Sequence, residues 1–166
     1  MVHDSSVMKG ALGLALAIAA GLPSTASAAP TDRADITGLA DLAFGQLTMA
    51  SDQTLSENVC AFSNSATTAY AVQATGDGTG SAFTLSNGSA TLPYEVRWAD
   101  SPGQTNGTTL TTGATVTGFA SGGAQKTCQG SPASSATLLV TIRAAAAGSA
   151  QVGSYSGVLT LMLTPQ

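Results

Sequence analysis

The sequence has almost no histidine and few charged side chains. Its single histidine, His3, lies near the start, and only 8% of all residues are charged. The absence of histidine beyond that point excludes Ser-His-Asp and Cys-His catalysis and removes the commonest transition-metal ligand. Basic residues number five against nine acidic ones, which disfavours nucleic acids and anionic membranes as partners. We therefore expect no enzyme, no cofactor and no metal site.

Long apolar runs are also scarce, and the one that exists lies at the beginning. Residues 1–28 combine a short polar start containing Lys9, an apolar run over residues 11–22 and the tail Ala26-Ser27-Ala28. This order is typical of a signal peptide with an A-x-A cleavage site, and the run is shorter than the roughly 20 residues of a membrane helix. The sequence therefore predicts export through a periplasm to the cell surface or beyond, with no integral membrane segment after cleavage.

Cysteine is limited to two residues, Cys60 and Cys128. Disulfides form and persist in exported proteins, so we expect these two side chains to be joined. Closing a loop of this length would stabilise the fold by roughly 4 kcal/mol on the chain-entropy estimate. Two separate free thiols are the alternative, and a metal site would need further ligands nearby.

The residues that are abundant are Gly, Ser, Thr and Ala, and between them apolar residues alternate over short stretches. Alternation with a period of two indicates half-buried strands, here over residues 91–98 and 136–143. The side chains predicted to face the core are Leu92, Tyr94, Val96 and Trp98 in the first stretch and Leu138, Val140 and Ile142 in the second.

The strongest strand pattern is at the C-terminal end, over residues 153–166. Tyr155, Leu159, Leu161 and Leu163 fall on one side of the alternation, and Pro165 ends it. A chain that ends on its most apolar strand leaves open what pairs with the outer edge of that strand. An unpaired edge recruits other chains unless it is covered.

Weaker apolar stretches complete the pattern. We interpret residues 36–47 as one strand that is kinked near its glycines. Residues 144–153 are a small-residue connection whose alanine run could form one helical turn, although nothing caps it. Further strands are predicted over residues 57–63, 69–75, 82–85 and 114–119. Roughly eight short strands, with a turn signal about every ten residues, predict an all-β sandwich in a single domain.

The order of these residues has a parallel in a known family. The ordered set is Leu42-x-Phe44-Gly45, Val59-Cys60, Tyr70-x-Val72, Phe83-x-Leu85, Leu92-Pro93-Tyr94-x-Val96-x-Trp98, Cys128, Leu138-x-Val140-x-Ile142 and Gly153-x-Tyr155-x-Gly157-x-Leu159-x-Leu161. It resembles the spore coat protein U domain, which is also the pilin domain of archaic (Csu-type) chaperone–usher pili. The resemblance covers residues 42–166.

The resemblance implies an immunoglobulin-like β-sandwich that lacks its last strand. In that family, a periplasmic chaperone first fills the resulting groove with a strand, and the N-terminal extension of the next subunit later replaces it. Carried over, this makes Tyr155, Leu159, Leu161 and Leu163 the wall of the groove. The implied partners are a periplasmic chaperone, an outer-membrane usher and neighbouring pilus or coat subunits.

Residues 29–41 comprise a short polar leader, residues 29–35, and the start of the first strand, residues 36–41, which are too few to serve as both donor and first strand. The leader lacks the alternating apolar residues that polymerising subunits of the family donate. We therefore expect a chain that accepts a strand without giving one, as a terminal or minor subunit with a role in adhesion or biofilm formation. The alternative is a stand-alone secreted binding module whose sandwich is already complete.

Overall fold

The computed structural model describes residues 31–123, 125–129 and 133–166. The predicted signal peptide, residues 1–28, lies outside the described residues. The part that begins at Thr31 forms one compact unit, to which the following description applies.

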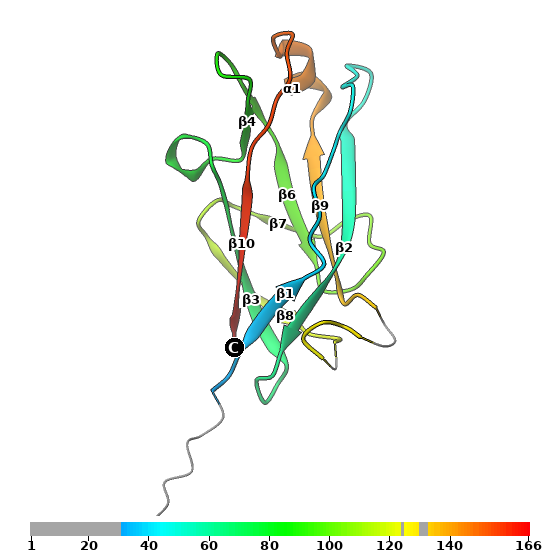
Figure 1. Ribbon diagram of the computed structural model, residues 1–166, viewed down its shortest axis with the longest axis vertical. Helices are drawn as coiled ribbons and strands as arrows, with labels where there is room; N and C mark the ends of the chain where they lie inside the picture. Colours follow the sequence, from blue (N-terminus) through cyan, green and yellow to red (C-terminus); the bar gives the residue numbers. More distant parts are fainter. Residues whose placement is uncertain (1–30, 124, 130–132) are drawn as a thin grey trace, which may run out of the picture. The chain divides into compact units, whose positions relative to one another are not determined.

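Two antiparallel sheets account for most of this unit (Figure 1). The larger sheet has the strand order β1-β2-β9-β6-β7, made of Ala34–Thr37, Gln53–Ser63, Ala136–Ile142, Glu95–Ala99 and Thr108–Leu110. The smaller has the order β10-β3-β8, made of Leu159–Pro165, Ala69–Gly76 and Thr115–Ala120. A hairpin of β4 (Thr84–Ser86) and β5 (Thr91–Pro93) and two short helical turns, η1 (Thr79–Ser81) and α1 (Ala144–Ser149), complete the structure. The predicted all-β class and sandwich-like packing are confirmed.

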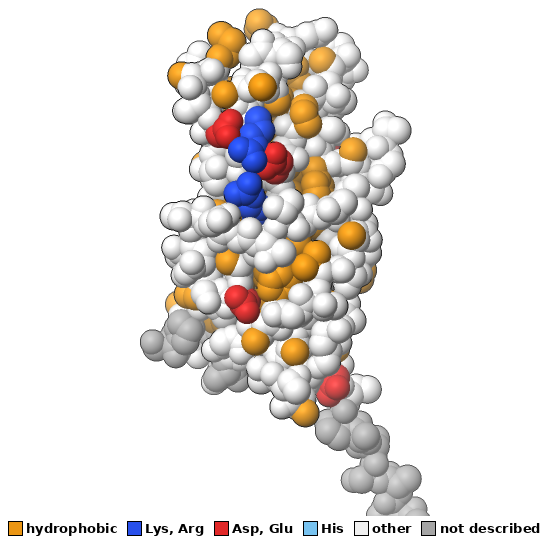
Figure 2. Space-filling view, turned by 180° about the vertical axis from the view of Figure 1, so that it is seen from behind, with side chains coloured by type: hydrophobic (Ala, Val, Ile, Leu, Met, Phe, Trp, Pro, Cys, Tyr) orange, Lys and Arg blue, Asp and Glu red, His pale blue; other side chains and the backbone are white. Residues whose placement is uncertain are grey.

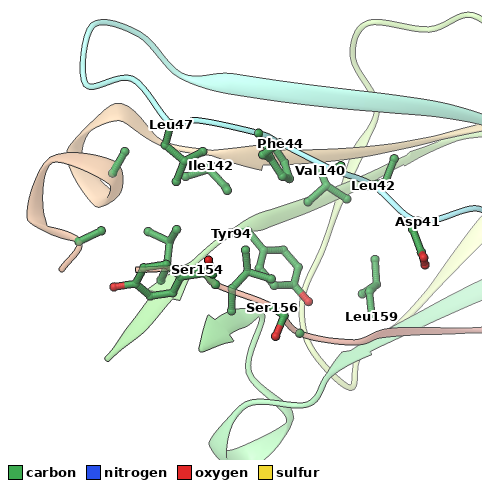
Figure 3. A pocket seen from close by; sticks show the side chains of 18 of the residues that line it. Asp41, Leu42, Phe44, Leu47, Tyr94, Val140, Ile142, Ser154, Ser156 and Leu159 are labelled. Atoms are coloured by element: carbon green, nitrogen blue, oxygen red, sulfur yellow. The ribbon is translucent and has the colours of Figure 1, made fainter. Parts of the chain in front are cut away.

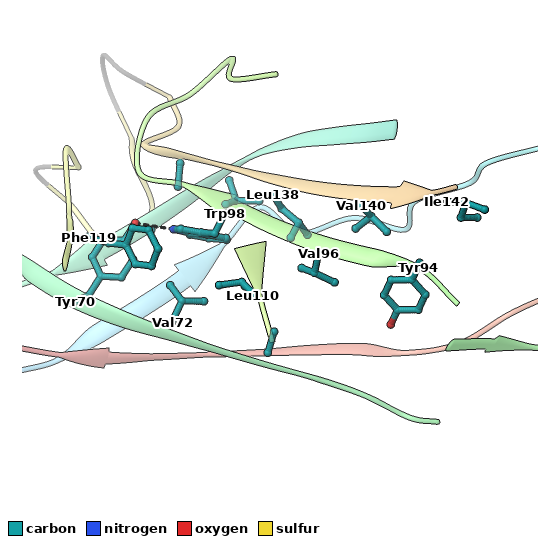
Figure 4. Close-up of a cluster of buried hydrophobic side chains, with 14 of the residues drawn as sticks. Tyr70, Val72, Tyr94, Val96, Trp98, Leu110, Phe119, Leu138, Val140 and Ile142 are labelled. Atoms are coloured by element: carbon teal, nitrogen blue, oxygen red, sulfur yellow. Dashed lines mark hydrogen bonds between the residues drawn. The ribbon is translucent and has the colours of Figure 1, made fainter. Parts of the chain in front are cut away.

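The core lies between the two sheets, where the inward apolar side chains of their strands pack together. All seven side chains predicted to face the core, in residues 92–98 and 138–142, are buried. At the centre, the Trp98 Nε1–H donates to the Tyr70 hydroxyl at 3.0 Å, and the two rings meet edge to face with centroids 6.4 Å apart (Figure 4). Phe119 stacks on the other side of Tyr70, with ring centroids 5.8 Å apart. This aromatic group joins β6 of one sheet to β3 and β8 of the other.

The predicted disulfide between Cys60 and Cys128 is confirmed, with Cα atoms 5.7 Å apart. It joins β2 to the loop between β8 and β9 across a sequence separation of 68 residues. Both cysteines are buried, so the bond fixes that loop against the larger sheet.

The prediction of one strand over residues 36–47 is wrong. The strand β1 ends at Thr37, and Gly38 adopts a φ of +83°, a left-handed conformation that interrupts the extended chain. Residues 38–52 carry no strand pairing. Their alternating side chains still face the core, because Leu42, Phe44 and Leu47 are half-buried between exposed neighbours.

A further local expectation needs correction. The alternation over residues 91–98 spans two strands, because β5 pairs with β4 whereas β6 pairs with β9. The break falls at Pro93 and Tyr94, since proline has no N–H for a continuous ladder.

The alanine run that follows β9 forms the short helix α1, which begins at Ala144 and has no side-chain cap. A helical turn without a cap is what the sequence allowed there.

The buried Trp98–Tyr70 hydrogen bond leads to a stability prediction. The variant Tyr70→Phe keeps the ring but leaves the indole N–H without its partner, so we expect the free energy of unfolding to fall by about 1–3 kcal/mol. Urea denaturation measures this loss. Tyr155→Phe is the matched control, because the Tyr155 hydroxyl donates to the Gln151 carbonyl at an exposed site. Equal effects of the two substitutions would contradict the prediction.

Candidate functional site: a groove beside the last strand

An elongated groove of about 1120 Å³ opens between β10 and residues 39–47 (Figure 3). Residues 39–47 form one wall, and residues 150–159 with Leu161 form the other. The floor consists of side chains from the core, and α1 borders the groove through Ala147. The floor residues are Leu85, Leu92, Tyr94, Leu138, Val140 and Ile142.

The wall formed by residues 39–47 has a largely unpaired backbone. Among the described residues, no backbone–backbone hydrogen bond involves this stretch. Its contacts include the Ala40 N–H, which donates to Glu57 Oε1 at 2.7 Å. The half-buried side chains of Leu42 and Phe44 pack against the core and hold the stretch there. Figure 3 shows both side chains close to Val140. Packing of side chains therefore holds this wall in place and leaves its backbone groups available.

The part of the opposite wall that belongs to β10, Leu159 and Leu161, lies on a sheet edge. Among the described residues, β10 pairs only with β3 and ends its sheet. The Asp77 N–H donates to the Val158 carbonyl at 3.1 Å, and the Gln166 N–H donates to the Ala69 carbonyl at 3.0 Å. Because backbone groups in an antiparallel strand alternate between its two edges, the even-numbered residues 158–166 face β3. Leu159, Leu161 and Leu163 therefore point their N–H and C=O groups away from β3, toward the open edge.

The same leucines also carry the inward side chains of β10. Leu159, Leu161 and Leu163 are half-buried, whereas the intervening Thr160 and Met162 are exposed. Side chains and edge-facing backbone groups both repeat every two residues in a strand, so one set of residues presents both. The open edge is thus backed by apolar side chains, which is the surface that an added strand requires.

The structure brings three of the four residues of the predicted wall into the groove. Tyr155, Leu159 and Leu161 line it, whereas Leu163 packs against the core beyond the lining. Tyr155 lies outside β10, in the stretch where Ser156 forms an isolated bridge to Ser86.

Sequence reasoning missed most of the remaining surface. It assigned Leu92, Tyr94, Leu138, Val140 and Ile142 to a closed core, although they also form the floor of the groove. It placed Leu42, Phe44 and Leu47 in a paired strand. The spacing of Leu42 and Phe44 gave the correct inward face but carried no information on strand pairing.

A group of ion pairs supports the end of the groove beside α1. Arg143 pairs through Nη1 with Asp52 Oδ2 at 2.7 Å and through Nη2 with Glu95 Oε2. The other oxygen of Asp52 accepts the Ala144 N–H at 2.9 Å, where α1 begins. Figure 2, which views the molecule from behind, shows basic and acidic side chains gathered in one such group on a face with few other charges.

These contacts lower the pKa values of both carboxyls. For Asp52, the main causes are the hydrogen bond from the Ala144 backbone and the one from Arg143, which lower its pKa below the ordinary value. For Glu95, the hydrogen bond from Arg143 has the same effect on the pKa.

Charged side chains are scarce in the lining of the groove. Among the described residues, Asp41 is the one charged residue that lines it, and its side chain forms no ion pair. Among the described residues, no three His, Cys, Asp or Glu side chains gather closely enough to hold a metal ion. A search of the same residues finds no helix with the length and apolar character needed to cross a membrane.

No family model, curated protein or solved structure matches this chain. The groove must therefore be interpreted from its own geometry. Its two features are an apolar floor and, among the described residues, backbone without backbone partners along residues 39–47 and the outer edge of β10.

The ion pairs beside α1 lead to a pH prediction. Because both carboxyl pKa values are lowered in the folded state, the unfolded chain binds more protons in acid, and stability falls as the pH decreases below about 4. We expect the double variant Asp52→Asn, Glu95→Gln to show a flatter loss of stability in urea denaturation between about pH 5 and pH 2. The control is Asp41→Asn, which should keep the steep acid dependence. A double variant as acid-sensitive as the original chain would refute the prediction.

The edge geometry of β10 leads to a hydrogen-exchange prediction. The amide protons of Thr160, Met162 and Thr164 face β3 and should exchange slowly, whereas those of Leu159, Leu161 and Leu163 should exchange rapidly. NMR-detected exchange on the intact chain measures this pattern. The strand β9 is the internal control, since it lies between β2 and β6 and its amides should all be protected. Uniform protection along β10 would show that its outer edge is already covered.

Proposed function

We propose that this chain is an exported structural subunit of a surface pilus or coat, which completes its fold by accepting a β-strand from another polypeptide. One observation carries the proposal: the floor of the groove is apolar, and among the described residues neither the stretch 39–47 nor the outer edge of β10 forms a backbone–backbone hydrogen bond. An extended strand is the ligand that satisfies both properties at once. A small molecule would leave these backbone groups unpaired.

Strand addition explains how such a groove would gain affinity and register. Main-chain hydrogen bonds along the edge of β10 supply affinity, and alternate apolar side chains in the groove fix the register. Apolar surface that the added strand removes from water contributes a favourable free energy of roughly 25 cal/mol per Å². The half-buried Leu42, Phe44, Leu159 and Leu161 would all gain from this burial.

The identity of the partners rests on the resemblance of the sequence to spore coat protein U domains and archaic chaperone–usher pilins. On this proposal, a periplasmic chaperone supplies the first strand, an outer-membrane usher receives the complex, and a neighbouring subunit supplies the final strand. The polar leader, residues 29–35, favours a place at the end of a fibre, because it offers no alternating apolar residues to donate. Without a donor, the open edge should make the chain prone to aggregation.

The experiment is to supply a donor strand within the chain. Gln166 directly follows the end of β10, so a C-terminal extension with a turn of about four residues could run back antiparallel along the open edge. The extension carries Val at the positions opposite Leu159, Leu161 and Leu163 and Thr between them. We expect it to raise the yield of exported monomer and the thermal midpoint of unfolding, and to protect the three edge-facing amides from exchange.

The matched control is an extension of the same composition in which Val and Thr exchange places. A shift of one residue turns the Thr side chains inward, so this control should give little stabilisation. Equal effects of the two extensions would contradict strand insertion. A stable monomer in good yield without any extension, with the β10 edge already protected, would favour the stand-alone binding module instead.

A further inference from the structure

The side chain of Tyr94 lies in the floor of the groove, between the ends of β5 and β6. Its backbone N–H donates to the Phe83 carbonyl at 3.0 Å, and its ring stacks on the Phe83 ring with centroids 5.6 Å apart. The residue is 7% exposed and lines the groove. In Figures 3 and 4 its hydroxyl end is directed away from β6 toward β10, on the side where Ser156 and Leu159 lie.

The Tyr94 hydroxyl is buried and forms no hydrogen bond with any described residue. Burial, with a smaller contribution from the negative charge of Asp77, raises the pKa of Tyr94 to about 12, so the hydroxyl stays protonated. A buried polar group without a partner is costly, and native structures rarely keep one without a reason. A phenylalanine at this position would give the same packing without the cost.

The other two tyrosines show the usual arrangement. The Tyr70 hydroxyl accepts the hydrogen bond from Trp98, and the Tyr155 hydroxyl donates to the Gln151 carbonyl. Tyr155 lines the same groove, so mere proximity to the groove does not leave a hydroxyl unpaired. Of the three tyrosines, Tyr94 is the one whose hydroxyl is buried and has no hydrogen-bond partner among the described residues.

An inserted strand would bring a partner for this hydroxyl from a specific direction. Its backbone groups lie in the plane of the sheet, where the edges of β10 and of residues 39–47 face them. Its inward side chains point toward the floor, where Tyr94 lies. The partner of the Tyr94 hydroxyl must therefore be a side chain.

We propose that the strand that fills this groove carries one short polar side chain (Ser, Thr or Asn) among its apolar inward residues, and that this side chain pairs with the Tyr94 hydroxyl. The inference rests on the proposed function, since it names the chemistry of the donor strand. The hydrogen bond would fix the register of an otherwise uniform apolar strand. A strand shifted by two residues would keep its apolar contacts but leave Tyr94 unpaired.

The test uses the full chain with the C-terminal extension of alternating Val and Thr. Each inward Val is replaced in turn by Thr, which has a similar shape, and urea denaturation gives the equilibrium constant for unfolding. We expect Thr to destabilise the protein at every inward position except one, at the Ser156–Leu159 end. There it should be tolerated or should stabilise, with an advantage of about fivefold over the other positions.

The Tyr94→Phe variant should remove that advantage while keeping the ring stacked on Phe83. Tyr155→Phe is the matched control and should leave the preferred position unchanged. The Thr scan is first made in the extended chain that keeps Tyr94. It needs no Tyr94 variant, so it remains decisive if Tyr94→Phe fails to fold. An equal cost of Thr at all inward positions, or a preference that survives Tyr94→Phe, would overturn the inference.

The two proposals fail in distinguishable ways. If no extension stabilises the chain, strand insertion itself is wrong. If the apolar extension stabilises the chain but no inward position prefers Thr, the groove accepts a strand and Tyr94 does not select it.

Discussion

The structure depends on the one-sided pairing of β10. Its ladder with β3 uses the backbone groups of the even-numbered residues, which leaves those of Leu159, Leu161 and Leu163 on the open edge. The register of this ladder also turns the same leucines toward the core. A shift of one residue would turn apolar side chains outward and leave Thr160 and Met162 facing the core. The coincidence of apolar side chains and free backbone on one set of residues is what makes this edge suitable for strand addition.

The core differs between its two ends. At one end, Trp98, Tyr70 and Phe119 pack across the two sheets, and the indole hydrogen bond is satisfied. Toward the other end, Tyr94, Val140 and Ile142 form the floor of the groove instead of meeting a second layer. The closed end and the disulfide hold the sheets in position, and the group of ion pairs around Arg143 holds the start of α1. A stable scaffold can therefore maintain an unfilled groove at its other end.

Much of the fold could be predicted because its signals are local. The alternation in residues 91–98 identified inward side chains correctly, since a period of two follows directly from strand geometry. In β9 the predicted side chains are buried too, but so are all the remaining residues of the strand, so burial does not alternate there. The presence of only two cysteines, in a chain whose sequence predicts export, led to the disulfide that the structure contains. The prediction for residues 36–47 failed at Gly38, because side-chain alternation reports which face is buried and not whether the backbone is paired. The single strand predicted over residues 91–98 failed for a related reason, since the two halves share a face but pair with different strands.

The sequence alone determined the all-β class, the inward residues of the main strands, the joined cysteines and the apolar character of the last strand. Only the tertiary structure decided which strands are neighbours, that β10 has one partner, and that residues 39–47 lie across an open groove from it. It also decided that the Tyr94 hydroxyl is buried without a partner, whereas those of Tyr70 and Tyr155 are paired. Alternation is a property of neighbouring residues in the chain. An unpaired edge or hydroxyl depends on what distant segments place beside it.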